Sequence, residues 1–274
     1  MEERKDGEKQ FHDALRSFSS EQRWSRELEG LIRNDPMWVN MKYYAIERKS
    51  RALVNRWYEE NCAGRKVLDF CCGNGDDSFL IARSGAREVV GVDISEVSIE
   101  NCRKRAAEEK IQGDMSFYAM DAEGLGFDGA TFDVVSEYGA LHHLDLEKAY
   151  SEIARVLKPG GKCICTETLG HNPLIHLYRK KTPHLRTPWE VEHILKKKDI
   201  EKARYFFDNV HILGFFYLAI LAAVPFRRSR FFSSLLGLLE TVDDALLKMP
   251  FLKWQAWQVV FVLENPKVPD RGNK

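Results

Sequence analysis

The stretch KVLDFCCGNGDDS, residues 66–78, decides the fold of this chain. A short apolar run ends at Asp69, and Gly73 and Gly75 then precede an apolar helical pattern. Glycine lets the backbone adopt left-handed angles and lets a ligand lie directly against the main chain. The first turn of a helix offers unpaired N–H groups. The stretch therefore predicts a strand, a tight turn and a helix, which together are typical of a nucleotide-type site.

Further strand-like runs follow in order, and helical patterns separate them. Asp93 ends the next run, where a carboxylate can accept both hydroxyls of a ribose. Such alternation of strands and helices predicts a parallel sheet. The runs are VVGVD (89–93), MSFYAM (115–120), FDVVS (132–136) and the segment 162–168 after LKPGG.

These motifs, in this order, resemble those of class I S-adenosylmethionine-dependent methyltransferases. The resemblance covers residues 64–170 and includes GVDIS, an acid after the third strand, and FDVV followed by LHHL. It implies an α/β fold with a Rossmann-like, seven-stranded, mostly parallel sheet whose last strand is antiparallel. The family's usual loop is D-x-G-x-G-x-G, and Cys71 stands here in place of the first glycine. Ser78 replaces the third glycine of a dinucleotide site, which disfavours a nicotinamide-dependent oxidoreductase.

The resemblance also implies the cofactor, S-adenosylmethionine, and the residues that would hold it. Asp69 and the glycine loop would hold the methionine part, Asp93 the ribose, Asp121 the adenine amino group, and Glu137 the methionine amine. The implied cofactor-binding residues are Asp69, Cys71, Gly73, Asn74, Gly75, Asp93, Ile94, Asp121, Ala122, Glu137 and Tyr43.

The resemblance implies that the chain divides into a helical cap over residues 1–63 and a methyltransferase domain over 64–267. Residues 1–10 are charged and lack an apolar core, so we expect them to be disordered. The domain carries two insertions, 171–203 and 214–256. The second insertion is strongly apolar and also holds several arginines. It is interpreted as a helical lid over the acceptor, and the alternatives are a membrane-surface contact or a homodimer interface.

Composition limits the classes of partner. Lysine plus arginine and aspartate plus glutamate both number 41, so no overall charge recruits nucleic acid. The amino terminus does not read as a signal peptide, and no run of eighteen apolar residues predicts a membrane span. Six cysteines without metal-type spacing favour reduced thiols in a cytoplasmic protein, with contact at a membrane surface left open.

The predicted reaction is methyl transfer to a lipophilic small-molecule acceptor, at oxygen. A hydroxyl acceptor needs a base, and the candidates are His171 and His142. Arg186 is expected to hold a polar or anionic end of the acceptor, beside Tyr44. The histidine spacings match no known metal-ligand pattern, so no metal is expected. The alternatives are methylation at carbon or nitrogen, and a cofactor-binding protein without transfer activity at a membrane surface.

Overall fold

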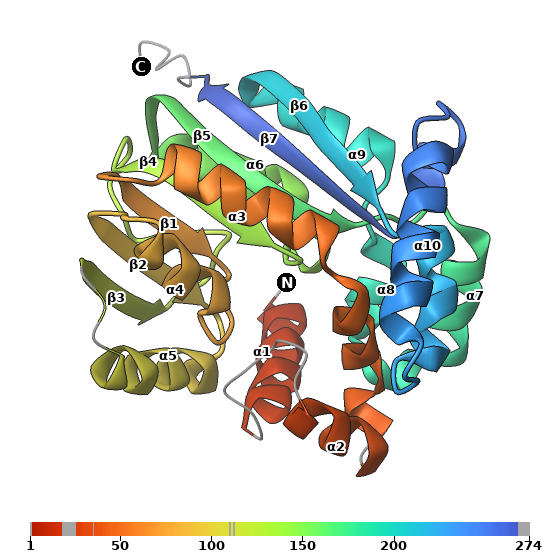
Figure 1. The fold of residues 1–274 in the computed structure, drawn as a ribbon. Coiled ribbons are helices and arrows are strands. Elements are labelled where there is room, and N and C mark those ends of the chain that lie inside the picture. The colour runs from red at the N-terminus through yellow and green to blue at the C-terminus, as the bar shows by residue number, and fades with distance from the viewer. Residues whose placement is uncertain (1, 18–25, 35, 110, 112, 268–274) are drawn as a thin grey trace.

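The centre of the molecule is one seven-stranded sheet with the order β3-β2-β1-β4-β5-β7-β6 (Figure 1). The computed structural model describes residues 2–17, 26–34, 36–109, 111 and 113–267. β7 runs antiparallel to both of its neighbours, and the strands from β3 to β5 pair in parallel. This confirms the predicted fold class. The strands are β1 (Lys66–Phe70), β2 (Glu88–Asp93), β3 (Asp114–Ala119), β4 (Phe132–Tyr138), β5 (Leu157–Thr168), β6 (Phe207–Phe216) and β7 (Gln258–Pro266).

Successive residues of each central strand bury side chains on opposite faces of the sheet. Val67 and Val134 pack with helices α3 (Lys49–Asn61) and α4 (Asp76–Arg83) on one face. Leu68 and Val135 pack with helix α6 (Leu146–Val156) on the other. Because helices cover both faces, neighbouring apolar residues such as Val67 and Leu68 are both fully buried, as is usual in parallel strands. Each such fully buried side chain contributes about 1.5–3 kcal/mol to stability.

Helices flank the sheet and gather beyond the carboxyl ends of its parallel strands. Several helices begin at capping side chains: the Asp145 side chain accepts from the backbone of Glu147 and Lys148, and the Thr187 side chain accepts from that of Glu190. The helices are α1 (Glu2–Arg16), α2 (Arg26–Asn34), α3 (Lys49–Asn61), α4 (Asp76–Arg83), α5 (Glu96–Glu108), α6 (Leu146–Val156), α7 (Pro173–Lys181), α8 (Pro188–His193), α9 (Lys197–Lys202) and α10 (Phe232–Leu246), with 3-10 turns at η1 (Pro36–Ile46), η2 (Leu141–His143), η3 (Pro183–Leu185), η4 (Ala203–Tyr205), η5 (Ala219–Phe226) and η6 (Leu252–Gln255).

The expectation of disorder over residues 1–10 was wrong for residues 2–10, which form most of helix α1. Their charged side chains find partners on the domain: Arg4 pairs with Glu123 and Lys5 pairs with Asp121. Leu15, near the end of the helix, packs in a small apolar cluster with Ile32. α1 lies next to α5 (Figure 1), across the edge where β1 and β2 end. The charged side chains that suggested a disordered tail therefore form the ion pairs that hold this helix against the domain.

The helices α7, α8 and α10 of the two insertions lie on the opposite side of the molecule from α5 (Figure 1). The first holds α7, η3, α8 and α9, and the second holds η5, α10 and η6. β6 continues to Phe216, so the second excursion begins after residue 216 and not at 214. Among the described residues, no helix has the length and apolar character needed to cross a membrane.

Candidate functional site

The turn after β1 takes the conformation that its glycines predicted. Gly73 and Gly75 have φ angles of +51° and +79°, and Gly75 is the residue before α4. A side chain at Gly75 would be strained, because its Cβ would lie 2.9 Å from the sulfur of Cys102. Cys71 also has a positive φ, +59°. The cysteine that replaces the family's first glycine therefore keeps a glycine-like backbone, at a conformational cost of about 1–2 kcal/mol.

The strain at Cys71 leads to a stability prediction. Cys71→Val should lower the free energy of unfolding by about 1–3 kcal/mol, because a β-branched residue fits left-handed angles poorly. Cys71→Gly should leave the free energy near that of the parent. Cys163→Val on extended strand β5 is the matched control, with a cost below about 1.5 kcal/mol. Urea unfolding measures all three, and equal losses for both valine variants would contradict the strain.

Three carboxylates stand at the ends of neighbouring strands or directly after them. Asp93 Oδ2 accepts from the backbone N–H of Gly73 at 2.8 Å, and Oδ1 accepts from Ser95 N–H at 2.9 Å. Each carboxylate oxygen has a further lone pair, so both can still accept from a ribose hydroxyl. Asp121 Oδ1 accepts from the Glu123 N–H at 2.9 Å, and its Oδ2 pairs with Lys5.

Asp69 lies near the end of β1, is more buried than Asp93, and has a shifted pKa. Burial, together with the nearby charge of Asp77, raises the pKa of Asp69 to about 8. Ser78 Oγ donates to Asp69 Oδ2 at 2.5 Å, which partly offsets this effect. Asp77 in turn pairs with Arg51 of α3 at 2.6 Å. A cationic ligand group beside Asp69 would favour its charged form.

A first cavity, about 110 Å³ in volume, lies over this loop. Its floor comes from the ends of β1 and β2 and from the turn after β3, and it includes Asp69, Asp93 and Asp121. α1 forms the opposite wall. The acidic floor fits S-adenosylmethionine, which carries an ammonium and a sulfonium charge. The volume is below the range of about 300–1,000 Å³ for sites of drug-sized ligands. Helix α1 therefore narrows the first cavity, and its Lys5 pairs with Asp121, the carboxylate expected to contact the adenine.

A second, larger cavity of about 730 Å³ adjoins the first. Residues from the segment interpreted as a lid form part of its wall, including Leu218, Leu221 and Val224 from around η5. α7 and η1 supply the other sides. The two cavities share a border, because a set of residues lines both of them. The shared residues are His12, Arg16, Tyr138, Gly139 and His143.

His142 lines the second cavity and is held by a buried carboxylate. Its Nδ1 lies 2.8 Å from Glu167 Oε2, and Glu167 Oε1 accepts from the Leu141 N–H at 2.6 Å. Burial opposes charge on Glu167, but the adjacent His142 imidazole holds the pKa of this carboxyl below its ordinary value. Burial and the Glu167 charge raise the pKa of Glu137 well above its ordinary value. The contact between Glu167 Oε2 and Nδ1 fixes the orientation of the His142 ring.

The structure separates some predicted residues from the places expected for them. Glu137 does not line the first cavity. Its Oε1 accepts from the backbone N–H groups of Ala140 and Leu141 in the turn after β4, and its contact with the methionine amine stays a prediction. His171 lines neither cavity; its Nε2 accepts from the Lys197 N–H at 3.4 Å.

The remaining predicted residues fall on both cavities. Ile94, Ala122 and Cys71 line the first. Tyr43, predicted for the cofactor, lies with Tyr44 and Arg186 on the second. Asn74 and Gly75 belong to the loop but line neither cavity. Asn74 Oδ1 accepts from Asn101 Nδ2 at 3.2 Å.

Sequence reasoning missed the contribution of α1. Arg4, Lys5, Glu8 and His12 all line the first cavity. One signal was present: Glu8 and His12 are four residues apart, so on a helix they share a face. Their partners lie more than a hundred residues later in the chain, where no local pattern connects them.

Comparison with known proteins identifies the fold and the loop. The family model described as "Methyltransferase domain" matches residues 67–161. Demethylmenaquinone methyltransferase of Lactococcus lactis is 36% identical over 120 residues, which cover 43% of this chain and 46% of that protein. 27-O-demethylrifamycin SV methyltransferase of Amycolatopsis mediterranei is 37% identical over 101 residues, which cover 36% and 37% of the two chains. The chain thus spans less than half the length of these relatives.

A solved structure supports the fold over more of the chain. Phosphoethanolamine N-methyltransferase 2 of Haemonchus contortus, solved with S-adenosyl-L-methionine, aligns with a TM-score of 0.57 at 21% identity. The alignment covers 80% of this chain and 52% of that one. S-adenosylmethionine is the cofactor of this domain. The glycine loop after β1, the acids at the strand ends and these matches together identify residues 67–161 as a class I S-adenosylmethionine-dependent methyltransferase domain.

Proposed function

We propose that this chain transfers a methyl group from S-adenosylmethionine to an oxygen atom of a small-molecule acceptor with an apolar body. The observation that carries the proposal is the His142–Glu167 pair on the wall of the second cavity. Glu167 engages Nδ1, so the other ring nitrogen, Nε2, is left to accept a proton from an acceptor hydroxyl. A histidine oriented by a carboxylate is a common general base.

The arrangement of the two cavities supports direct transfer. The cofactor supplies an electrophilic methyl group. An acceptor in the second cavity can approach the first across their shared border, where Tyr138, Gly139 and His143 line both. The chain's contribution is to hold the acceptor oxygen about 3–3.5 Å from the methyl carbon and to exclude water. The apolar wall from η5 suits the hydrophobic body of an acceptor. The volume of the second cavity, about 730 Å³, is in the range for a small-molecule site.

Arg186 is the proposed contact for a polar end of the acceptor. It is buried on the wall of the second cavity, and its Nη1 already donates to the carbonyl oxygens of Arg179 and Thr182. Its Nε makes no hydrogen bond and lies 3.5 Å from Glu190 Oε1. A polar acceptor group would therefore meet a guanidinium whose position is fixed.

The test is a product analysis. The purified chain is incubated with S-adenosylmethionine carrying an isotopically labelled methyl group and with a panel of apolar phenols, amines and carbon acids. We expect a labelled methyl ether, identified by NMR. A labelled amine or carbon product would overturn oxygen as the acceptor atom. Tight cofactor binding without transfer to any acceptor would favour the alternative, a cofactor-binding protein without activity.

A substitution in the apolar wall tests the role of the second cavity. Leu221→Ala should raise the acceptor KM roughly fivefold, because it removes about 1 kcal/mol of apolar contact. Leu221 lies in η5 and lines the cavity, whereas Val242 on α10 is exposed and lines neither cavity. Val242→Ala is therefore the matched control and should leave KM unchanged. Equal KM values for both variants would place the acceptor elsewhere.

A further inference from the structure

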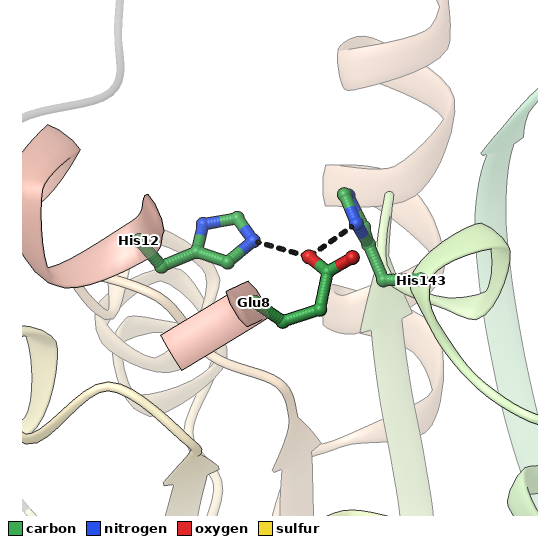
Figure 2. Close-up of side chains that lie close together, drawn as sticks. All are labelled: Glu8, His12 and His143. Atoms are coloured by element: carbon green, nitrogen blue, oxygen red, sulfur yellow. Dashed lines mark ion pairs between the residues drawn. The ribbon is translucent and has the colours of Figure 1, made fainter. Parts of the chain in front are cut away.

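Three side chains converge at the border between the two cavities. Glu8 and His12 come from α1, and His143 comes from the 3-10 turn η2 after β4. Figure 2 shows the Glu8 carboxylate between the two imidazole rings. Glu8 Oε2 lies 3.0 Å from His143 Nδ1 and 3.6 Å from His12 Nε2. Each residue can offer one ligand atom so that all three atoms lie within 4.8 Å of one another.

The facing atoms of this cluster are not satisfied by hydrogen bonds. Glu8 Oε2 and His143 Nδ1 are buried and have no hydrogen-bond partner, although they lie 3.0 Å apart. Glu8 is only 5% exposed. Its other oxygen, Oε1, accepts from Thr187 Oγ1, which fixes the carboxylate and leaves Oε2 directed at the rings. Buried polar atoms that face one another without hydrogen-bond geometry need another explanation.

The two separations that involve Glu8 Oε2, 3.0 Å and 3.6 Å, are close to those between neighbouring ligands of one metal ion. With metal–ligand bonds of about 2.0–2.1 Å, adjacent donors lie about 3.0 Å apart in octahedral and about 3.4 Å apart in tetrahedral geometry. We propose that Glu8, His12 and His143 bind one divalent transition metal ion at this border. Two imidazoles and one carboxylate suit zinc, cobalt, nickel, iron or manganese better than calcium or magnesium. Three protein ligands leave further positions open toward the cavities.

Surrounding contacts hold the ligands in place, as is usual around metal sites. Thr187 anchors the carboxylate, and Arg4 Nη1 donates to the backbone carbonyl oxygen of His143 at 2.6 Å. Because two ligands come from α1 and one from the domain, the ion would fasten α1 over the cofactor cavity. The inference does not depend on which acceptor atom is methylated.

A neighbouring set is the main competing site. His142, His143 and Glu190 also place ligand atoms within 4.8 Å of one another. Glu190, however, pairs with Arg179 at 2.7 Å, and His142 Nδ1 is engaged by Glu167. In the set with Glu8, the carboxylate oxygen Oε2 accepts no hydrogen bond and, among the described residues, contacts only the two imidazoles, so this is the set we assign.

The experiment uses cobalt(II) as the probe. The full chain is stripped with a chelator and titrated, while calorimetry gives the affinity and visible absorption reports the ligand field. We expect one ion per chain, with affinity lowered roughly tenfold or more in Glu8→Gln, His12→Gln and His143→Gln. His211→Gln is the matched control, since His211 is exposed on β6, away from the cluster.

A second readout follows the helix itself. Hydrogen exchange over residues 2–17 should slow when cobalt(II) is added to the parent chain and should not change in His12→Gln. His12 is only partly buried, so this variant is expected to fold, and circular dichroism checks that it does. The proposal is overturned if the chain binds no stoichiometric ion or if Glu8→Gln and His12→Gln bind it like the parent. It is also overturned if only His142→Gln and Glu190→Gln lose binding.

Discussion

Replacing His142 with asparagine is expected to lower kcat by roughly 10²–10⁴-fold, the usual contribution of a positioned general base. The affinity for S-adenosylmethionine should stay the same, because His142 lines the acceptor cavity and not the cofactor cavity. Asparagine keeps a polar side chain of similar reach but cannot accept the proton at neutral pH. Steady-state kinetics with an identified acceptor gives kcat, and calorimetry gives the cofactor dissociation constant.

Glu167→Gln separates base catalysis from simple packing. Glu167 acts as a positioning residue through His142, so its variant should lower kcat less than His142→Asn and shift the pH profile of kcat. His184→Asn is the control, since His184 is exposed and lines neither cavity. If His142→Asn keeps nearly the parent kcat across the pH range, an acceptor that needs no base becomes the better interpretation.

The convergence of three acids on the first cavity could be predicted from sequence because strand order determines it. Asp69, Asp93 and Asp121 each end a parallel strand or directly follow one, and such ends meet at one edge of a sheet. The predicted turn also required positive φ angles, which Gly73 and Gly75 adopt. Local chemistry and topology therefore gave the same answer for these residues.

The contribution of α1 could not be predicted because its order depends on distant partners. Arg4 and Glu123 are separated by 119 residues, and a charged segment of this composition is equally compatible with a solvated tail. Only the folded domain places Asp121 and Glu123 beside the helix. Burial opposes charge on Glu123, but the hydrogen bond from the Asp145 N–H and the contact with Arg4 hold the pKa of this carboxyl below its ordinary value.

Glu137 and His171 illustrate a different limit. Both follow or end strands at the correct edge, so their positions along the chain were reasonable for a site. The direction of a side chain at a strand end depends on the next turn, and here the turn after β4 gives its N–H groups to Glu137. The insertion folds His171 against Lys197. Neither contact has a signature in the sequence around it.

Asp93→Ala is expected to weaken S-adenosylmethionine binding by about 1.5–3 kcal/mol, the range for hydrogen bonds to a charged group. This corresponds to roughly a tenfold to hundredfold rise in the dissociation constant. The carboxylate would lose two ribose contacts, and it would also release the N–H groups of Gly73 and Ser95. Because Gly73 belongs to the turn that faces the cofactor, both effects act in the same direction.

Further variants distinguish the loss of the ribose contact from a loss of order in the turn that contains Gly73. Asp93→Asn keeps one carbonyl oxygen as an acceptor, so its loss of affinity should be intermediate. Glu96→Ala is the control: Glu96 lies three residues later, and its carboxylate pairs at the surface with Lys9, 2.7 Å away. Calorimetry measures the three dissociation constants, and thermal unfolding without cofactor measures the turn. An unchanged dissociation constant for Asp93→Ala would remove Asp93 from the site. The ribose contact contributes nothing to stability in the absence of cofactor. If Asp93→Ala lowers the free energy of unfolding by as much as it lowers the free energy of binding, Asp93 acts by stabilising the turn and not by contacting the ribose.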